Sequence, residues 1–196
     1  MNPQKYKTEK LVPINLPEIC APRALLMDVY RKASEKRCIY IHAPAGSGKT
    51  VSTLLWLRES EYKIIWIGLD TYDNILAGFY RIFCMALFSA VPHEESLAEL
   101  IKVPEFSASP VEYAIEILSL LSFEDCKYAL VFDDFHLITN KEIIKSLIYV
   151  FKRLPLSVTI MILSRNELPE AFSQYEESGK IACIGADEQA FKGNEI

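Results

Sequence analysis

The stretch Ile39–Leu57, "IYIHAPAGSGKTVSTLLWL", decides the fold class of this 196-residue chain. It begins as an apolar, strand-like run, breaks at a loop of small residues and continues as a helical pattern. A strand that passes through a glycine-containing loop into a helix is the first half of a β–α unit. Lys49 and Thr50 stand where the loop gives way to the helix, so the break carries a positive charge and a hydroxyl group.

The loop Ala43–Thr50, "APAGSGKT", matches the phosphate-loop pattern G-x-x-x-x-G-K-[ST], except that Ala43 replaces the first glycine. Alanine fits there if the residue keeps ordinary backbone angles. Backbone N–H groups of such a loop converge on an anion, and the next helix directs its N-terminus at the same point. We expect Lys49 to reach the β- and γ-phosphates and Thr50 to ligate Mg²⁺. The predicted nucleotide contacts here are Ala45, Gly46, Ser47, Gly48, Lys49, Thr50 and Val51.

Five short apolar runs recur along the chain and do not alternate with polar residues, which is typical of strands covered on both faces. Helical patterns separate them. The sequence therefore predicts an α/β fold, with a parallel sheet, right-handed crossovers and helices on both faces. The runs are Cys38–Ala43, Lys63–Leu69, Tyr128–Asp134, Val158–Ser164 and Ile181–Ala186.

Helix starts can be predicted at three places. Ser109–Glu112 and Thr139–Glu142 have the spacing of a capping box, and Asp73-Asn74 is expected to cap a helix over Ile75–Phe88. An aromatic stripe at helical spacing within that last helix favours a place in the core over a base-stacking platform. The stripe consists of Phe79, Tyr80, Phe83 and Phe88.

An acidic pair ends the run "YALVFDD", where a phosphate loop needs a metal-holding carboxylate. We expect Asp133 to lie behind the Mg²⁺ and Asp134 to polarise the attacking water; the plainer alternative is a pair of turn or capping aspartates. Asp70, after the run "KIIWIGL", is a second candidate for orienting water. A turn role for Asp70 in "DTYDN" is equally consistent with the sequence.

Two further polar residues follow buried runs. Arg165, after "VTIMILS", can contact the γ-phosphate if its strand lies beside the phosphate loop; otherwise it is a surface arginine. His136, in "FDDFHLI", is assigned no role, since a histidine among apolar residues is usually structural.

Composition limits the classes of function. A net charge of −5 with scattered basic residues disfavours nucleic-acid binding by this chain alone. Five cysteines without a paired motif favour reduced, packed thiols over disulfides or zinc. The N-terminus reads as polar, and no apolar run approaches the length of a membrane helix. These features predict a cytoplasmic protein.

With these residues in hand, the chain resembles the nucleotide-binding domain of STAND-class P-loop ATPases, a branch of the AAA+ type. More closely, it resembles the N-terminal ATPase domain of large MalT-like LuxR-type transcriptional regulators. Besides the phosphate loop, the motifs that carry the resemblance are "KLVP" (Lys10–Pro13), "APRALL" (Ala21–Leu26), "WIGLDTYDN" (Trp66–Asn74), "LVFDDFHLI" (Leu130–Ile138), "RLP" (Arg153–Pro155) and "LSRNELP" (Leu163–Pro169).

The resemblance implies a three-layer P-loop NTPase fold whose five-stranded parallel sheet has the order 5-1-4-3-2. It implies that Arg165 is the sensor-1 arginine and a catalytic residue with Lys49 and Asp134. It also implies that Arg23 lies near the adenine, with Pro13–Arg23 lining the base pocket and Ile19 or Ala21 on the ring. From the residues alone, Arg23 is only the start of an amphipathic helix.

The function implied is an ATP/ADP switch with slow, Mg²⁺-dependent hydrolysis. We expect residues 1–12 to form an N-terminal arm, loose as far as Lys10, and residues 13–196 the ATPase domain, as a fragment of a longer regulator. The effector domains and the DNA-binding helix-turn-helix of full-length relatives lie outside these residues. An effector and DNA are therefore partners of a parent protein, which the resemblance also suggests could self-associate. No membrane partner is expected.

Two other classes remain open. A small-molecule kinase also uses a phosphate loop but usually needs an arginine-rich lid, and the sequence has no such arginine cluster. An interaction module that binds nucleotide without turnover is disfavoured by the intact Lys49, Thr50 and Asp133.

Overall fold

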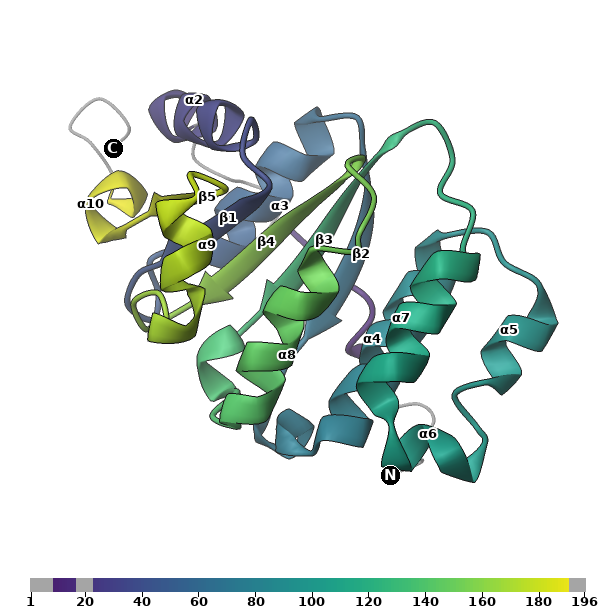
Figure 1. Ribbon diagram of the computed structural model, residues 1–196. Coiled ribbons are helices and arrows are strands. Elements are labelled where there is room, and N and C mark those ends of the chain that lie inside the picture. Colours follow the sequence, from purple (N-terminus) through teal and green to yellow (C-terminus); the bar gives the residue numbers. More distant parts are fainter. Residues whose placement is uncertain (1–8, 17–22, 191–196) are drawn as a thin grey trace.

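The computed structural model describes residues 9–16 and 23–190. Its strands form one all-parallel sheet in the order β2-β3-β4-β1-β5, which confirms the predicted order (Figure 1). Each strand falls on one of the five apolar runs, with bounds that differ by at most two residues. The strands are β1 Cys38–His42, β2 Tyr62–Gly68, β3 Lys127–Asp133, β4 Val158–Ser164 and β5 Ile181–Ile184.

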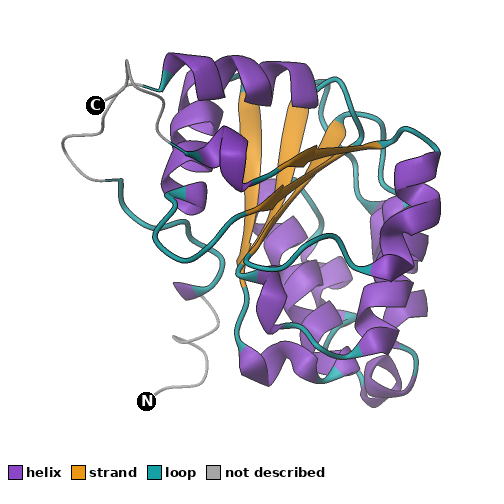
Figure 2. Cartoon of the chain, turned by 90° about the vertical axis from the view of Figure 1, so that its left-hand side faces the viewer, coloured by secondary structure: helices purple, strands orange, loops and turns teal. Residues whose placement is uncertain are grey.

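Helices connect successive strands and cover both faces of the sheet, as Figure 2 shows from the side. The α-helices are α2 Ala24–Ala33, α3 Lys49–Glu59, α4 Leu76–Ala90, α5 Glu95–Glu99, α6 Pro104–Ala108, α7 Pro110–Leu120, α8 Lys141–Phe151, α9 Ser173–Glu177 and α10 Ala186–Gln189. The 3-10 helices are η1 Thr71–Asn74, η2 Phe135–Leu137 and η3 Glu170–Phe172. No helix in the described ranges is long and apolar enough to cross a membrane.

Alternation along the strands divides the core into two layers, because successive side chains point to opposite faces. On one face Tyr40 and Phe132 pack against α4, α7 and α8. On the other face Ile41 and Val131 pack against α2 and α3. This is the expected three-layer arrangement. Phe79, Tyr80 and Phe83 of α4 are fully buried in the first layer, which confirms a place in the core for these three residues of the aromatic stripe. Phe88, the fourth, is half-buried and packs against the same layer.

The carboxyl ends of the parallel strands meet at one edge of the sheet. The backbone N–H of Ala43, directly after β1, donates to the Ser164 carbonyl at the end of β4 (3.3 Å). The N–H of Leu69, after β2, donates to the Asp133 carbonyl at the end of β3 (3.0 Å). Every candidate residue that follows β1, β2, β3 or β4 is therefore brought to this edge.

The predicted helix caps are corrected by the structure. Asn140, not Thr139, caps α8, and its side chain accepts from the Glu142 N–H (2.9 Å). Ser109 precedes α7 but makes no side-chain cap, since α6 ends one residue before it and turns its backbone away from the capping conformation. Ile75 precedes α4, again without a side-chain cap. A capping box does occur earlier in the chain, where Asp70 and Asp73 cap the start of η1.

Two other expectations can be compared with the described residues. Cys38, Cys84, Cys126 and Cys183 are free thiols, but the expected packing holds only for Cys38 and Cys84, since Cys126 is half-buried and Cys183 is exposed. The fifth cysteine lies outside the described ranges. Lys10, assigned to the loose arm, is instead fixed to β2, because its carbonyl accepts from the Gly68 N–H (2.8 Å).

Candidate functional site

The loop between β1 and α3 adopts a conformation that requires its glycines. Gly46 and Gly48 have φ angles of 79° and 80°, in the left-handed region that other L-residues avoid. Gly48 precedes α3 directly. Ala43 is not among the described residues with positive φ, so alanine replaces the usual glycine without backbone strain. The loop therefore leads its backbone into the positive end of the α3 dipole, the arrangement that binds phosphate in other proteins.

Lys49 begins α3, and its ammonium group folds back over the loop. Its Nζ donates to the carbonyls of Ala43 (2.6 Å) and Pro44 (2.9 Å). Burial and the nearby positive charge of Arg165 lower the pKa of Lys49, against an opposing attraction from Asp134 and Asp133. Two backbone carbonyls therefore hold the Lys49 ammonium group at the loop. A phosphate group could take their place as its hydrogen-bond partner.

Thr50 and Asp133 meet across the site. The Thr50 hydroxyl donates to the Asp133 carboxylate, at 3.1 Å from Oδ1 and 3.2 Å from Oδ2. Burial and repulsion from Asp134 raise the pKa of Asp133 to about 6, although the Thr50 hydrogen bond opposes this. A buried carboxylate destabilised in its charged form is suited to a cation, so this pair of oxygen donors fits Mg²⁺.

The described residues contain no cluster of three or more histidine, cysteine or acidic side chains that could hold a metal by themselves.

Asp134 has the only positive φ of any described residue other than glycine (56°). Its N–H donates to Oδ1 of Asp133 (3.0 Å), so the backbone of this turn supports the first carboxylate. Aspartate tolerates this region better than most residues, but the conformation still costs about 1 kcal/mol or more. The Asp134 side chain is half-exposed.

His136 is a site residue that sequence reasoning missed. Its Nδ1 lies 3.8 Å from Oδ1 of Asp134 and is buried with no hydrogen-bond partner among the described residues. Burial, together with the positive charges of Arg165 and Lys49, lowers the pKa of His136, although Asp134 opposes this. The only signal for it in the sequence is its position two residues after the acidic pair.

Arg165 follows Ser164, the last residue of β4, and its side chain is exposed. Its charge acts on both Lys49 and His136. Since β4 lies between β1 and β3, the strand order brings Arg165 between the phosphate loop and the acidic pair. Lys49, Thr50, Asp133, Asp134 and Arg165 therefore gather at one edge, as predicted for their strands.

Asp70 also ends a strand at this edge, but its carboxylate is already engaged. Oδ1 accepts from the Tyr72 N–H (2.8 Å) and Oδ2 pairs with Lys10 Nζ (2.8 Å). These contacts correspond to the turn role that the sequence left open.

Arg23 lies on the opposite side of the phosphate loop from the acidic pair. Its side chain is buried, and a methyl group placed on Gly48 would lie 4.0 Å from its Nη1. Its Nη2 donates to the carbonyl of Gln189 in α10 (2.6 Å). Ile19 and Ala21, predicted to contact the adenine, lie outside the described residues.

Gln189 was also missed by sequence reasoning. Its buried side chain accepts from the Ser52 hydroxyl (3.3 Å) and donates to the Tyr30 hydroxyl (3.2 Å). Ser52 lies in the first turn of α3, where the Lys49 carbonyl (3.1 Å) is an alternative acceptor for the single proton of its hydroxyl. A buried polar network thus joins α10, α2 and the phosphate-loop helix.

Comparison with known proteins relates this chain to one group of regulators. It is 29% identical over 178 residues to the HTH-type transcriptional regulator MalT of Vibrio campbellii, a match covering 90% of this chain. MalT of Yersinia enterocolitica is 28% identical over 159 residues, which cover 81% of this chain and 18% of that protein. The resemblance to MalT-like regulators is confirmed. The chain spans only 19% of the length of the Vibrio campbellii relative.

Comparisons with family models and with solved structures give less information than these relatives do. No protein-family model matches the chain. A solved structure of Drosophila ORC bound to DNA aligns with a TM-score of 0.47 and 12% identity, covering 92% of this chain and 46% of that one. A similarity at that level carries no functional information.

Proposed function

We propose that this chain is the nucleotide-binding switch domain of a MalT-like transcriptional regulator, and that it binds ATP and ADP with Mg²⁺ at the Ala43–Thr50 loop. The observation that carries the proposal is the contact between Thr50, in the first turn after the loop, and Asp133, at the end of a neighbouring strand. A hydroxyl at the end of the loop and a carboxylate at the end of a neighbouring strand are the pair that holds Mg²⁺ in P-loop NTPases.

The cofactor contacts follow from the same geometry. Thr50 and Asp133 would hold Mg²⁺, directly or through water, and the ion would supply charge neutralisation at the β- and γ-phosphate oxygens. The N–H groups of Ala45 to Val51, with the Lys49 ammonium, would bind the phosphates. Arg23, buried behind Gly48, would lie on the nucleoside side of the loop.

A switch requires groups that distinguish ATP from ADP, and only contacts to the γ-phosphate can do so. Lys49, Asp134 and Arg165 are these groups. Asp134 would accept a hydrogen bond from the attacking water and orient it, and Arg165 would neutralise charge that develops on the γ-phosphate. We expect turnover to be slow, so that the bound nucleotide reports a state rather than fuelling repeated cycles.

The parent regulator would use this switch to control DNA binding. The relatives are named as helix-turn-helix transcriptional regulators, and this chain aligns with about a fifth of their length. Effector recognition, DNA contacts and any nucleotide-dependent self-association would involve parts of the parent outside this chain.

Replacing Lys49 with alanine tests the proposal. Loss of a charge-assisted contact to phosphate should weaken ATP and ADP binding by about 30- to 100-fold, about 2–3 kcal/mol. Isothermal titration calorimetry with Mg-ATP and Mg-ADP measures this, and phosphate release from the wild-type chain measures turnover.

Lys36→Ala is the matched control, because Lys36 is an exposed lysine outside the loop. It should bind nucleotide like the wild type. Equal affinities of Lys49→Ala and wild type would refute the phosphate-loop assignment. Tight binding without any phosphate release would leave a nucleotide-binding module and remove hydrolysis from the proposal.

A further inference from the structure

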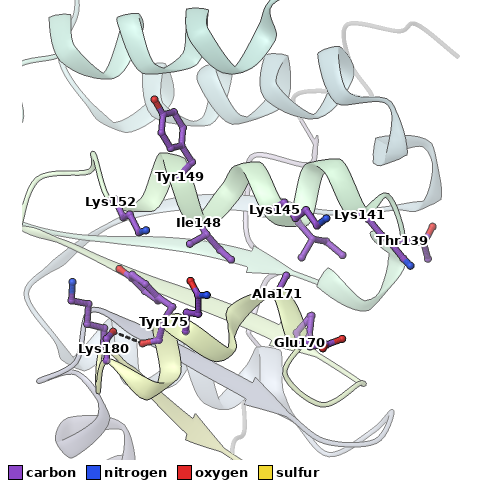
Figure 3. Close-up of a pocket in the computed structure, with 14 residues that line it drawn as sticks. Thr139, Lys141, Lys145, Ile148, Tyr149, Lys152, Glu170, Ala171, Tyr175 and Lys180 are labelled. Atoms are coloured by element: carbon purple, nitrogen blue, oxygen red, sulfur yellow. Dashed lines mark hydrogen bonds between the residues drawn. The ribbon is translucent and has the colours of Figure 1, made fainter.

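A large groove lies away from the phosphate loop, between α8 and the η3–α9 segment. Its volume is about 980 Å³. In Figure 3, Lys145, Ile148 and Lys152 project from α8 toward Ala171 and Tyr175 on the facing segment. The strand β4 separates the two sides in the sequence, so the groove forms only when α8 and the η3–α9 segment pack side by side.

The two faces of α8 explain why the groove is lined as it is. Ile143, Leu147 and Phe151 point into the core. Lys141, Lys145, Ile148 and Lys152 follow a second stripe with spacings of four, three and four residues, which places them on a common face. Along this second stripe one half-buried apolar side chain lies among exposed lysines, so within the described residues the stripe is an amphipathic surface open to solvent.

The groove carries an excess of positive charge on an acidic chain. Four lysines line it, Lys141, Lys145, Lys152 and Lys180, against the single carboxylate of Glu170. Within the described parts of the chain, none of these lysines forms an ion pair, although ion pairs occur elsewhere on the surface. Four unneutralised lysines around one hollow, in a chain of net charge −5, create a local potential that attracts an acidic occupant.

The apolar floor indicates what kind of acidic occupant fits. Ile144, Ile148, Pro169 and Ala171 lie between the lysines. A surface with a central apolar strip and charged rims matches an amphipathic helix, whose apolar face enters the groove while acidic side chains meet the rims. From Lys141 to Lys152 the α8 axis rises about 17 Å, equal to about three turns of a docked helix.

The aromatic residues of the groove disfavour a nucleic acid. The Tyr175 ring is buried, with Lys180 Nζ 5.8 Å from its centroid. The Tyr149 ring points away from the groove in Figure 3, and the Arg153 guanidinium covers it at 3.4 Å. Neither ring offers a free face for base stacking, and all the cations that line the groove are lysines rather than the arginines preferred for phosphate recognition.

We propose that this lysine-lined groove is a docking site for an acidic amphipathic helix of a partner protein. Nothing in the proposal depends on nucleotide binding.

A labelled model peptide of about three to four helical turns, with leucines along one face and glutamates elsewhere, tests the proposal by fluorescence anisotropy with the full chain. A second peptide has the same composition with its leucines scrambled off the common face. Oligo-glutamate and a single-stranded oligothymidine serve as further probes. The first peptide should bind saturably and more tightly than the other three.

Charge reversal locates the site. In the double variant Lys145→Glu/Lys152→Glu, affinity for the first peptide should fall by at least about tenfold. The matched control Lys32→Glu/Lys36→Glu makes the same charge change on exposed lysines near α2 and should change affinity by less than about twofold. Circular dichroism melts confirm that both variants fold.

Four results would overturn the proposal. They are no saturable binding of the first peptide, equal binding of the scrambled peptide or oligo-glutamate, tighter binding of the oligothymidine, and equal losses in the two double variants. Equal binding of the scrambled peptide or oligo-glutamate would indicate electrostatic attraction without recognition of shape. Tighter binding of the oligothymidine would indicate a nucleic-acid surface.

Discussion

The loops after β2 and β3 lie side by side and use the same residue type in opposite ways. After β2, Asp70 and Asp73 cap their own turn and pair with Lys10, which lies 2.8 Å from Asp70 and 2.7 Å from Asp73. Burial alone would lower the pKa of Lys10, but these two carboxylates outweigh it and raise that pKa. The acidic groups of this loop are therefore satisfied within the chain.

In the loop after β3, polar groups are instead left in unfavourable environments. Asp133 is buried with a raised pKa, Asp134 holds a left-handed backbone conformation, and no described residue forms a hydrogen bond with the His136 Nδ1. Unfavourable features gathered in one loop are typical of a site arranged for an external ligand. The contrast distinguishes structural carboxylates from candidate functional ones at two neighbouring strand ends, which the sequence alone could not do.

The largest expected effect comes from Asp133→Asn in the metal-free protein. Because the pKa of Asp133 is raised from an ordinary 3.8 to about 6, the folded state binds the proton more tightly than the unfolded state. Stability therefore falls as pH rises from 3.8 to about 6 and stays lowered above that. The neutral variant avoids this penalty and should be more stable at pH 8 by up to about 3 kcal/mol.

Urea denaturation with a chelator at pH 8 and pH 3.5 measures the difference, which should vanish at the lower pH. The same variant should lose about 10- to 100-fold of its Mg²⁺-dependent nucleotide affinity. A destabilised variant at pH 8 would remove the distinction between the two loops.

The same substitution in the neighbouring loop should have the opposite sign. Asn also caps helices well, so Asp70→Asn keeps the turn but loses the charge that pairs with Lys10. We expect a loss of about 1.5 kcal/mol in the free energy of unfolding. Urea denaturation in a Lys10→Met background is the control, since the loss should disappear when no cation is present. A loss that persists there would place the effect in the cap.

The smallest expected effect is the difference between alanine substitutions at two glycines that share a left-handed backbone conformation. Gly46 in the phosphate loop has φ 79°, Gly179 before β5 has φ 69°, and a methyl group on either would meet no atom within 4 Å. Alanine at each should cost about 1 kcal/mol in stability by strain alone.

Only Gly46→Ala should also weaken nucleotide binding, by about tenfold, because it would shift the N–H groups proposed to bind phosphate. Thermal melts and calorimetry measure the two quantities. Equal nucleotide affinities of the two variants would argue that the loop geometry is not used for binding.

The fold could be predicted because its signals are local. Five apolar runs gave five strands, and the edge that joins Lys49, Asp133 and Arg165 follows from parallel pairing. The strand order came from the family resemblance, and the structure agrees with it.

Contacts between distant segments could not be predicted. Asn74 was expected to cap α4, but its side chain instead accepts from the backbone N–H groups of Thr139 (2.7 Å) and Asn140 (3.0 Å). The Thr139 N–H is therefore bound to Asn74, and Asn140 is the residue that caps α8. A capping pattern read along the chain contains no information about a partner 65 residues away.

The position of Gln189 has a mechanical consequence. Its carbonyl accepts from Arg23, and its side-chain amide accepts from Ser52 and donates to Tyr30. These hydrogen bonds connect α10, the last described helix, to α3 and α2. If α10 were displaced, three hydrogen bonds would open together and Ser52, three residues after Lys49, would lose a partner. A displacement of α10 would therefore be felt in the first turn of α3, directly after the glycine loop.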